Sequence, residues 1–581
     1  MLKVLAQRNL KSSESISMYN ISQDKEDKFS LPCFTRPYIP PILAVYIAAH
    51  LVLFLILRSA RLYEMACTQK LMVYLSSAVS LLCSYAIIPA CIGSACVGCT
   101  VLLYRYAHVA APWYMFLKRA QKIGWMVILT ASTSCVLGVF LVYQTCVRQY
   151  VLQHISARNE LTCMCIADSR SVFHSYVTPA KIFVNDSYMG TCELISKEAL
   201  ELYSTYTVHG QFKAYTSDTN KLSTCAQGIL GSVTIGRVHH VQKPVGLYGL
   251  ASFIRLQCMN MLKRSTPEHS ALMLASICGF KEPMHQLGMT DLFRVCGISH
   301  VVCVSGTHLA LFSLLIAKIL SHMPLSLFTQ RILTLCLSLV FVMSCGMPLS
   351  AIRAWGLVVC SVFADFFRAQ RHVISTVSCT ALVMIALNPW CACDVSFILS
   401  VSCVIGLALF GNYVYFLVEW AYVKLLRTLL YVCAHSKGYL KRVLELLIHT
   451  IQAKALTSVL QVASVSLCAQ VSTLPFSVGF FQGVSFIAVL SNVLLVPCMV
   501  YAALLAVITI MCAPCAPVSE LLLCVGSYAT SAILLVLKLF SKFPIAYVST
   551  DGLSAGLAFS VAVFLVVIAY KWPRPGTHDV Y

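Results

Sequence analysis

The feature that most constrains this chain is a series of long segments without a single charged residue. Of its 581 residues, 59% are hydrophobic and only 11% are charged, whereas soluble domains carry about a quarter charged residues. A helix that crosses a hydrocarbon layer of about 30 Å needs roughly 20 apolar residues. The uncharged segments are 37–57, 71–104, 123–147, 295–317, 332–352, 372–393, 395–418, 455–519, 521–537 and 552–570. They predict an α-helical polytopic membrane protein.

Segment lengths give an expected number of crossings. Residues 455–519 are too many for one span and must hold two or three, and 71–104 suits one span with a re-entrant piece. A further span over about 350–367 is expected, because Asp365 can reach the headgroups. Together these segments predict about 11 to 14 transmembrane helices.

Positive charge in the short loops predicts the orientation. The chain carries a net charge of +20, and the loop at 105–122 has four basic residues and no acidic one. Because basic loops stay in the cytoplasm, three N-terminal spans would place residues 148 onward outside. We therefore expect a multi-pass protein of the cell inner (plasma) membrane with an extracytoplasmic insert. The polar, basic first 36 residues do not have the pattern of a secretory signal.

The insert at 148–243 differs in composition from its surroundings, with nine Lys or Arg and seven Asp or Glu. Three β-rich segments precede residue 190, the segment "GTCELISKEALELY" at 190–203 has helical propensity, and two more β-rich segments follow. Three strands, a helix and two strands form the element order of an OB-fold, a small barrel that binds single-stranded nucleic acid or sugar. We thus expect an external, β-rich OB-like domain after the third span.

Four cysteines of the insert lie in an oxidising compartment if the insert is external. A bond between Cys163 and Cys165 is not expected, because alternate residues of one strand point the same way yet lie too far apart to pair. A disulfide from this pair to Cys192 or to Cys225 is compatible with the sequence, and the spacing does not choose between them.

A helix that lies in the membrane interface is expected after the insert. In "LASFIRLQCMNMLKR", Leu250, Ile254, Cys258 and Met261 share one helix face, and Arg255 is expected on another. A second helix is expected to begin near Pro267, after a Thr cap. The predicted division is a cytoplasmic basic tail (1–36), N-terminal transmembrane helices (37–147), the OB-like domain (148–243), amphipathic interfacial helices (244–294), the transmembrane core (295–570) and a C-terminal tail (571–581).

The stretch "GISHVVCVSGTHLALF" at 297–312 places His300, Ser305, Gly306 and His308 in a membrane-compatible segment. Polar groups there are costly to expose to lipid, so they face protein or water. We favour the polar lining of a translocation path, in which the Ser-Gly break lets irregular backbone face a cavity. Three alternatives are polar residues packed against helix carbonyls, a serine hydrolase in which His308 activates Ser305, and a metal site from the two histidines.

Together with three later segments, this stretch resembles the ComEC family of competence proteins. The segment "FRVCGISHVVCVSGTHLALFSLL" from Phe293 is similar to the family signature, although Thr307 stands where Leu is usual. The segments "PLSAIRAWGLVV" from Pro348, "NPWCACDVSFILSVSCVIGLALFG" from Asn388 and "AQVSTLPFSVGFFQGVSFIAVLSNVLLVP" from Ala469 follow in the family's order, with Ile398 where Gln is common. The resemblance implies signature positions at His300, Ser305, Gly306, His308, Arg353, Asp394, Ser400, Gln470, Pro475 and Asn492.

The resemblance implies a channel that carries single-stranded DNA across the inner membrane during natural transformation. Many family members end in a metallo-β-lactamase-like nuclease domain, and this chain ends at "KWPRPGTHDVY" without an HxHxDH motif. It also has no GxxxxGK[ST] loop. We therefore expect no enzymatic activity, no cofactor and no metal. The expected partners are single-stranded DNA, the lipid bilayer, a separate DNA receptor, a nuclease, and a cytoplasmic ATPase or single-strand-binding protein; a homo-oligomer is also compatible with the sequence.

DNA needs positive groups for its phosphates and aromatic faces for its bases. The candidates for phosphate contact in the insert are Lys181, Lys213, Arg237 and Lys243. The candidates for base stacking are Phe183, Tyr206, Phe212 and Tyr215, although aromatic residues on short barrel strands more often form the core.

In the membrane core, Arg353 must pair or face water, and Asp394 is a candidate partner. Alternatively, both residues lie at the headgroups. Three other functions fit the sequence less well: transport of another polymer or a lipid-linked saccharide, intramembrane hydrolysis by Ser305 and His308, and a degenerate homologue that no longer transports DNA.

Replacing Ser305 and His308 together by Ala distinguishes a hydrolase from a channel. A hydrolase would lose all activity because it would lose both its nucleophile and its base. A channel would lose conduction only, and oligonucleotide binding by residues 148–243 would be unchanged. Binding measured at two salt concentrations also separates DNA from saccharide, since phosphate contacts give a steep salt dependence.

Overall fold

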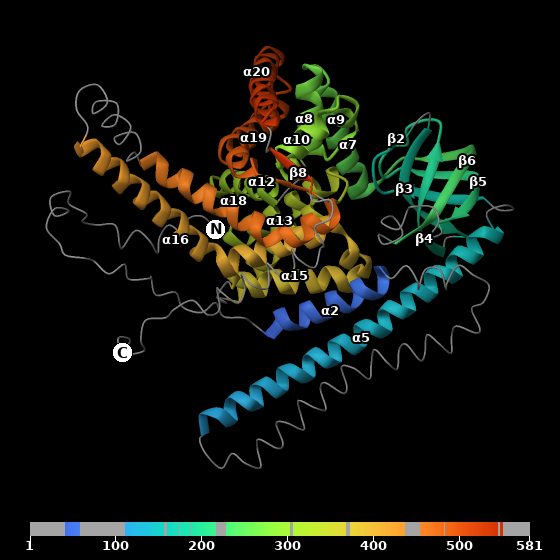
Figure 1. Ribbon diagram of the computed structural model, residues 1–581. Helices are drawn as coiled ribbons and strands as arrows, with labels where there is room; N and C mark the ends of the chain where they lie inside the picture. The colour runs from blue at the N-terminus through green and yellow to red at the C-terminus, as the bar shows by residue number, and fades with distance from the viewer. Residues whose placement is uncertain are drawn as a thin grey trace. The chain divides into compact units, whose positions relative to one another are not determined.

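The computed structural model describes residues 41–58, 111–155, 160–172, 175–185, 187–215, 228–302, 306–367, 372–435, 454–481, 483–543 and 546–549. Most of these residues form helices, and one sheet stands apart from them (Figure 1). The predicted class, a helical polytopic membrane protein with a β-rich domain, is confirmed.

Seven helices among the described residues are long and apolar enough to cross a membrane. Only 17% to 33% of the residues in these spans are buried inside the protein, as expected for helices that present apolar side chains to lipid. The helices that contain these spans are α5 (Ala111–Ile155), α13 (Leu327–Ser344), α14 (Leu349–Phe366), α16 (Val395–His435), α18 (Lys454–Phe481), α19 (Ala488–Met511) and α20 (Ala516–Ser541).

Three shorter apolar helices accompany these spans: α2 (Pro41–Arg58), α12 (Gly306–Ser321) and α15 (Val373–Leu387). The long uncharged run at 455–519 holds two helices, α18 and α19, and reaches the start of α20. The runs 71–104 and 552–570 lie outside the described residues, so the expected total of 11 to 14 spans stays a prediction.

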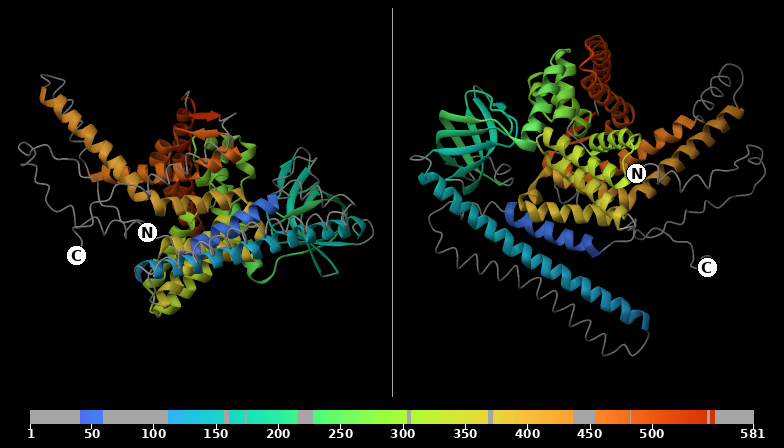
Figure 2. Two further views of the ribbon diagram at one scale, coloured as in Figure 1. Left: turned by 60° about the horizontal axis from the view of Figure 1, so that its bottom comes forward. Right: turned by 180° about the vertical axis from the view of Figure 1, so that it is seen from behind.

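Helices distant in sequence pack side by side in the membrane core. Figure 1 shows α2 between α5 and α15, and Figure 2 shows α16 and α18 as a long adjacent pair. Gly406 permits the close approach of this pair, because a side chain there would collide with Ser472 of α18. The Sγ atom of Cys468 lies 3.7 Å from the Gly406 carbonyl oxygen.

The β-rich domain is a closed ring of five strands with an added short strand. The ring runs β1, β3, β4, β6, β5 and back to β1, and only the β4–β6 pair is parallel. This small mixed barrel agrees with the predicted OB-like domain. Its strands are β1 (Leu161–Cys165), β2 (Arg170–Val172), β3 (Ser175–Val184), β4 (Ser187–Ser196), β5 (Thr205–Ala214) and β6 (Ile229–Gln242).

The prediction of a helix at 190–203 is wrong. Strand β4 continues to Ser196, with alternately buried residues from Gly190 onward, and turns lead on to β5. Pairing with β3 on one side and β6 on the other outweighs the helical propensity of Glu, Leu, Lys and Ala. The predicted break between a second and a third strand is also absent, because β3 is continuous from Ser175 to Val184.

Three of the four insert cysteines lie in the barrel core as free thiols. Cys163, Cys165 and Cys192 are fully buried, and no bond joins the first two to Cys192. Burial raises the pKa of Cys163 and that of Cys165 to about 12, so both are protonated thiols at neutral pH. Cys225 lies outside the described residues, and a disulfide to it stays a prediction.

Helix α5 connects the membrane helices to the barrel without a break. At 1.5 Å per residue its 45 residues span roughly 67 Å, which exceeds a hydrocarbon layer of about 30 Å. Near its C-terminal end, Leu152 is fully buried in the barrel core. The Gln149 side-chain amide donates to the carbonyl oxygen of Leu230 at 2.6 Å. The barrel is therefore held by the helix that leads into it.

Arg255 of α7 (Gly246–Leu262) fixes the other side of the barrel. Its guanidinium is 4% exposed and forms an ion pair with the Asp168 carboxylate at 2.5 Å. It also donates to the carbonyl oxygens of Cys278, at 2.5 Å, and Ser344, at 2.8 Å, which end α8 (Pro267–Cys278) and α13. Burial raises the pKa of Asp168, and the nearby Arg255 opposes this shift. The prediction that Arg255 lies on a different face from Cys258 and Met261 is wrong, because all three residues are buried.

The amphipathic stripe predicted for this helix is divided between two environments. Leu250 and Ile254 are exposed, whereas Cys258 and Met261 are buried. Helix α8 begins at Pro267 as predicted but is not amphipathic, because its residues from His269 to Cys278 are all buried. It packs against α7, α19 and α20, which cover it. Short helices α9 (Glu282–Gln286), α10 (Met289–Val295) and α11 (Ser299–Val302) follow.

Replacing Arg255 by Gln is expected to destabilise the junction between barrel and helices. The change leaves Asp168 without its cation and two carbonyl groups without their donor, and breaking a buried ion pair in this way costs about 3–5 kcal/mol. Thermal unfolding of the purified protein measures the loss. The control is Lys263→Gln, an exposed residue at the end of the same helix. Equal unfolding temperatures for the two variants would contradict the proposed clamp.

Candidate functional site

The polar stretch at 297–312 lies where the chain enters the helical core. Helix α11 ends at Val302 and α12 begins at Gly306; Ser305 lies outside the described residues. Gly297 has a φ of +71°, and a side chain there would collide with Ala488 and Ser485. Glycine therefore lets this segment approach the start of α19 closely.

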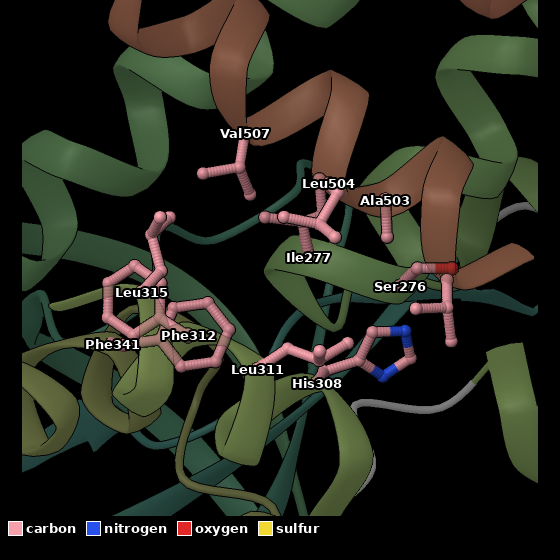
Figure 3. A pocket seen from close by; sticks show the side chains of 11 residues that line it. Ser276, Ile277, His308, Leu311, Phe312, Leu315, Phe341, Ala503, Leu504 and Val507 are labelled. Atoms are coloured by element: carbon pink, nitrogen blue, oxygen red, sulfur yellow. The ribbon is translucent and has the colours of Figure 1, made fainter. Parts of the chain in front are cut away.

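His308 stands near the start of α12 and is buried. It lines a cavity of about 30 Å³ whose other walls come from α8, α13 and α19 (Figure 3). His308 and Ser276 are the only polar side chains of this lining, and the Ser276 hydroxyl donates to the Leu272 carbonyl. A cavity of this size and polarity does not hold a nucleotide, since ligand sites have roughly 300–1,000 Å³.

His300 has a different environment. Its side chain is exposed. Within the described residues, no group of three or more His, Cys, Asp or Glu side chains could hold a metal ion, which gives the metal interpretation of His300 and His308 no support.

Arg353 of α14 is a buried cation without an acidic partner among the described residues. Its side chain is 5% exposed, and its Nε and Nη1 atoms have no hydrogen-bond acceptor in the described part of the chain. Tyr46 of α2 and Cys403 of α16 are close enough to interact with it electrostatically. An unpaired guanidinium is costly in an apolar surrounding.

Two residues of α2 extend this polar region. The Tyr46 hydroxyl lies 3.0 Å from Nδ1 of His50. The His50 ring stacks on Phe397 of α16, with centroids 5.8 Å apart and an interplanar angle of 10°. Sequence analysis missed both residues. The signal was present, because two polar side chains four residues apart in an uncharged run share one helix face.

The predicted pairing of Arg353 with Asp394 is not observed. Oδ1 of Asp394 accepts a hydrogen bond from the Phe397 backbone N–H at 2.8 Å, so Asp394 caps the start of α16. Lys281 is the cation that interacts with it electrostatically. Because the Asp394 carboxylate caps the first turn of α16, it does not form an ion pair with Arg353.

The remaining signature residues connect α18 to the segment that follows it. The Gln470 side-chain amide donates to the Ser485 carbonyl at 3.0 Å, and the Asn492 amide donates to the Ser466 hydroxyl at 2.7 Å. Pro475 lies inside α18. Ser400 is half-buried on α16. Gln470 and Asn492 therefore tie the helices together, and the Oδ1 atom of Asn492 is buried without a partner among the described residues.

Most of the candidates for base stacking are in the barrel core. Tyr206, Phe212 and Tyr215 are buried, and the hydroxyl of Tyr215 donates to the Glu193 carboxylate. This corrects the prediction that these three rings stack on bases. Of the four predicted rings, Phe183 is the one with partial exposure.

The basic candidates of the insert have the exposure that phosphate contact requires. Lys181, Lys213 and Lys243 have exposed side chains. The backbone of Arg237 pairs with His209, and its side chain lies outside the described set.

Comparison with known proteins gives one match. Residues 282–575, which are more than half of the chain, match a family model described as "Competence protein". The matched range encloses the predicted transmembrane core at 295–570. No curated protein and no solved structure matches the chain.

Substitution of Asp394 tests its role as a helix cap. Asn caps helices about as well as Asp, so Asp394→Asn should keep the thermal stability of the purified protein. Asp394→Ala should lower the stability by about 0.5–2 kcal/mol, because the first turn of α16 loses its acceptor. Equal destabilisation by Asn and Ala would instead mean that the negative charge itself is needed.

Proposed function

The chain belongs to the competence protein family, whose members take part in DNA uptake, and we propose that it carries single-stranded DNA through the inner membrane into the cytoplasm. The protein is a multi-pass membrane protein with DNA as its transported substrate. The strandedness of the DNA, the direction and the residues that line the route are our proposal.

The unpaired guanidinium of Arg353 is the observation that carries this proposal. A bundle that only needed to pack would not keep a cation 5% exposed beside Tyr46 and Cys403 with no acidic partner among the residues that the structure describes. A passing phosphodiester group supplies the missing anion and accepts charge-assisted hydrogen bonds from the guanidinium. When no phosphate is present, the buried guanidinium is unpaired, which is unfavourable. Each phosphate contact must offset this cost, so binding stays weak enough for the strand to move on.

The connection between barrel and bundle supports a continuous route. Helix α5, the Arg255 clamp and the packing of Trp390 against Tyr215 and Ile229 hold the barrel on the membrane helices. OB-like barrels bind extended single strands. Basic loops on the opposite side of the bundle would then place the barrel outside the cell and make it the first part to meet DNA.

We interpret the described conformation as closed. The cavity beside His308 is about the size of a water molecule, so the helices must separate before a strand can pass. The prolines inside α18 and α19, Pro475 and Pro497, are places where such helices bend readily.

Partners must supply the steps for which we find no motif in this chain. Capture of duplex DNA, removal of one strand and pulling from the cytoplasm are assigned to a receptor, a nuclease, and an ATPase or single-strand-binding protein. This chain contributes the path and its selectivity for an anionic polymer.

Substitution of Arg353 separates a role in transport from a role in stability. Arg353→Met removes an unpaired buried charge, so the thermal stability of the purified protein should be equal or higher. Uptake of labelled DNA by a deletion strain that expresses this variant should fall by about tenfold or more, since a charge-assisted hydrogen bond contributes about 1.5–3 kcal/mol.

Arg331→Gln is the matched control, because Arg331 belongs to a partly exposed ion pair with Asp365. Such pairs contribute about 0–1 kcal/mol, and uptake should be unchanged. Uptake at the wild-type level with Arg353→Met, at equal protein amount, would remove the main support for the proposed route.

A further inference from the structure

A compact aromatic and basic patch lies on the outer surface of the barrel at the turn between β3 and β4. We name it the β3–β4 patch, and it consists of Arg148, Lys181, Phe183, Tyr188 and Thr191. The rings of Phe183 and Tyr188 are 5.7 Å apart at an angle of 55°. The guanidinium carbon of Arg148 lies 5.6 Å from the centroid of the Tyr188 ring.

Strand register explains why these side chains gather on the surface. Phe183 pairs with Tyr188 and Lys181 pairs with Thr191 across the β3–β4 hairpin. Their neighbours Ile182 and Val184 point into the barrel and are buried. Tyr188 is 44% exposed, and Lys181 is exposed beside it. The patch is therefore not part of the barrel core, unlike Tyr206 and Phe212.

The chemistry of the patch fits a single strand of nucleic acid. The half-buried Phe183 ring and the exposed Tyr188 ring offer surface for bases, which stack on aromatic side chains without regard to sequence. A guanidinium that contacts a ring through its face keeps its N–H edge for a phosphate. Lys181 supplies a second cation. Among the described residues, the carboxylate of Glu193 lies further along β4, and the hydroxyl of Tyr215 donates to it.

The patch also lies where a strand would have to pass on its way to the membrane. Arg148 belongs to α5 and lies close in sequence to two residues that contact the barrel. Gln149 donates a hydrogen bond to the barrel, and Leu152 is buried in the barrel core. Arg148 is thus at the barrel wall, at the end of a membrane-spanning helix. A strand on the patch would be held at the point where barrel and membrane helices meet.

From these contacts we propose that the β3–β4 patch binds single-stranded DNA, with Phe183 and Tyr188 stacking on bases and Arg148 and Lys181 contacting phosphates. The site rests on the proposed function and adds to it the place of first contact. Faces of the second and third strands of OB-like barrels commonly bind oligonucleotides, and β3 and β4 hold these positions in the ring.

Binding to the full-length protein in detergent tests the site. Fluorescence anisotropy with a labelled oligothymidylate should show about tenfold weaker binding for Tyr188→Ala and a larger loss when Phe183→Ala is added. Tyr188→Phe should bind like the wild type, because the ring is kept. Arg148→Gln should lower the slope of log affinity against log salt concentration by about 0.7, the value for one phosphate of a single strand.

Tyr150→Ala is the matched control. Tyr150 is an exposed ring on the same helix, two residues from Arg148 and therefore on the opposite side. It should leave oligonucleotide binding unchanged. Thermal unfolding of each variant shows whether the barrel is intact, and Tyr188→Phe serves as the folded reference.

The outcomes separate this inference from the proposed function. If the Phe183 and Tyr188 double variant binds oligothymidylate like the wild type, the patch is not the site, and uptake by the wild-type strain still supports transport. If the variants change association with anionic vesicles instead of oligonucleotide binding, the patch anchors headgroups and the inference fails. A wild-type protein that neither binds the oligonucleotide nor supports uptake would overturn the proposed function as well.

Discussion

A bilayer interior offers no hydrogen bonds, so every polar group inside this bundle must find its partner within the protein. Most do so locally. Asp394 caps α16, Gln470 reaches the Ser485 carbonyl, and Asn492 bonds Ser466. A few buried polar atoms have no partner among the described residues, such as Oδ1 of Asn492 and the hydroxyls of Ser378 and Ser491, and Arg353 is the arginine among these exceptions, through its Nε and Nη1 atoms. The same constraint that organises the helices therefore also singles out the residue suited to an anionic substrate.

Buried hydrogen bonds and an ion pair, both formed within the protein, join the barrel to the membrane helices. Arg255 satisfies the carbonyl groups that end α8 and α13 and simultaneously pairs with Asp168 of the insert. Helix α5 adds a rigid connection by placing Leu152 in the barrel core. The barrel is thus attached to the helices by buried contacts at both of these places.

Much of the fold followed from the pattern of charge. Uncharged runs marked the helices α13 to α16 and α18 to α20, and the charged insert marked the barrel. The prediction at 190–203 failed because Glu, Leu, Lys and Ala favour a helix locally, whereas β3 and β6 on either side enforce a strand. For the site, the resemblance to the family identified Arg353 and Asp394 but not their separate roles. Tyr46 and His50 lie about 300 residues away from Arg353 in the sequence, so no local pattern joined them to it.

The sequence by itself determined that the chain is a polytopic membrane protein, where its soluble insert lies and to which family it belongs. Hydrophobicity, charge and motif order can be read directly from the sequence, because they do not depend on contacts between distant residues. Only the tertiary structure decided which way each side chain points. It buried Tyr206, Phe212 and Tyr215, exposed Tyr188 beside Arg148, and turned Arg255 inward as a clamp. The reason is register and helix packing, which depend on pairings between residues far apart in the chain.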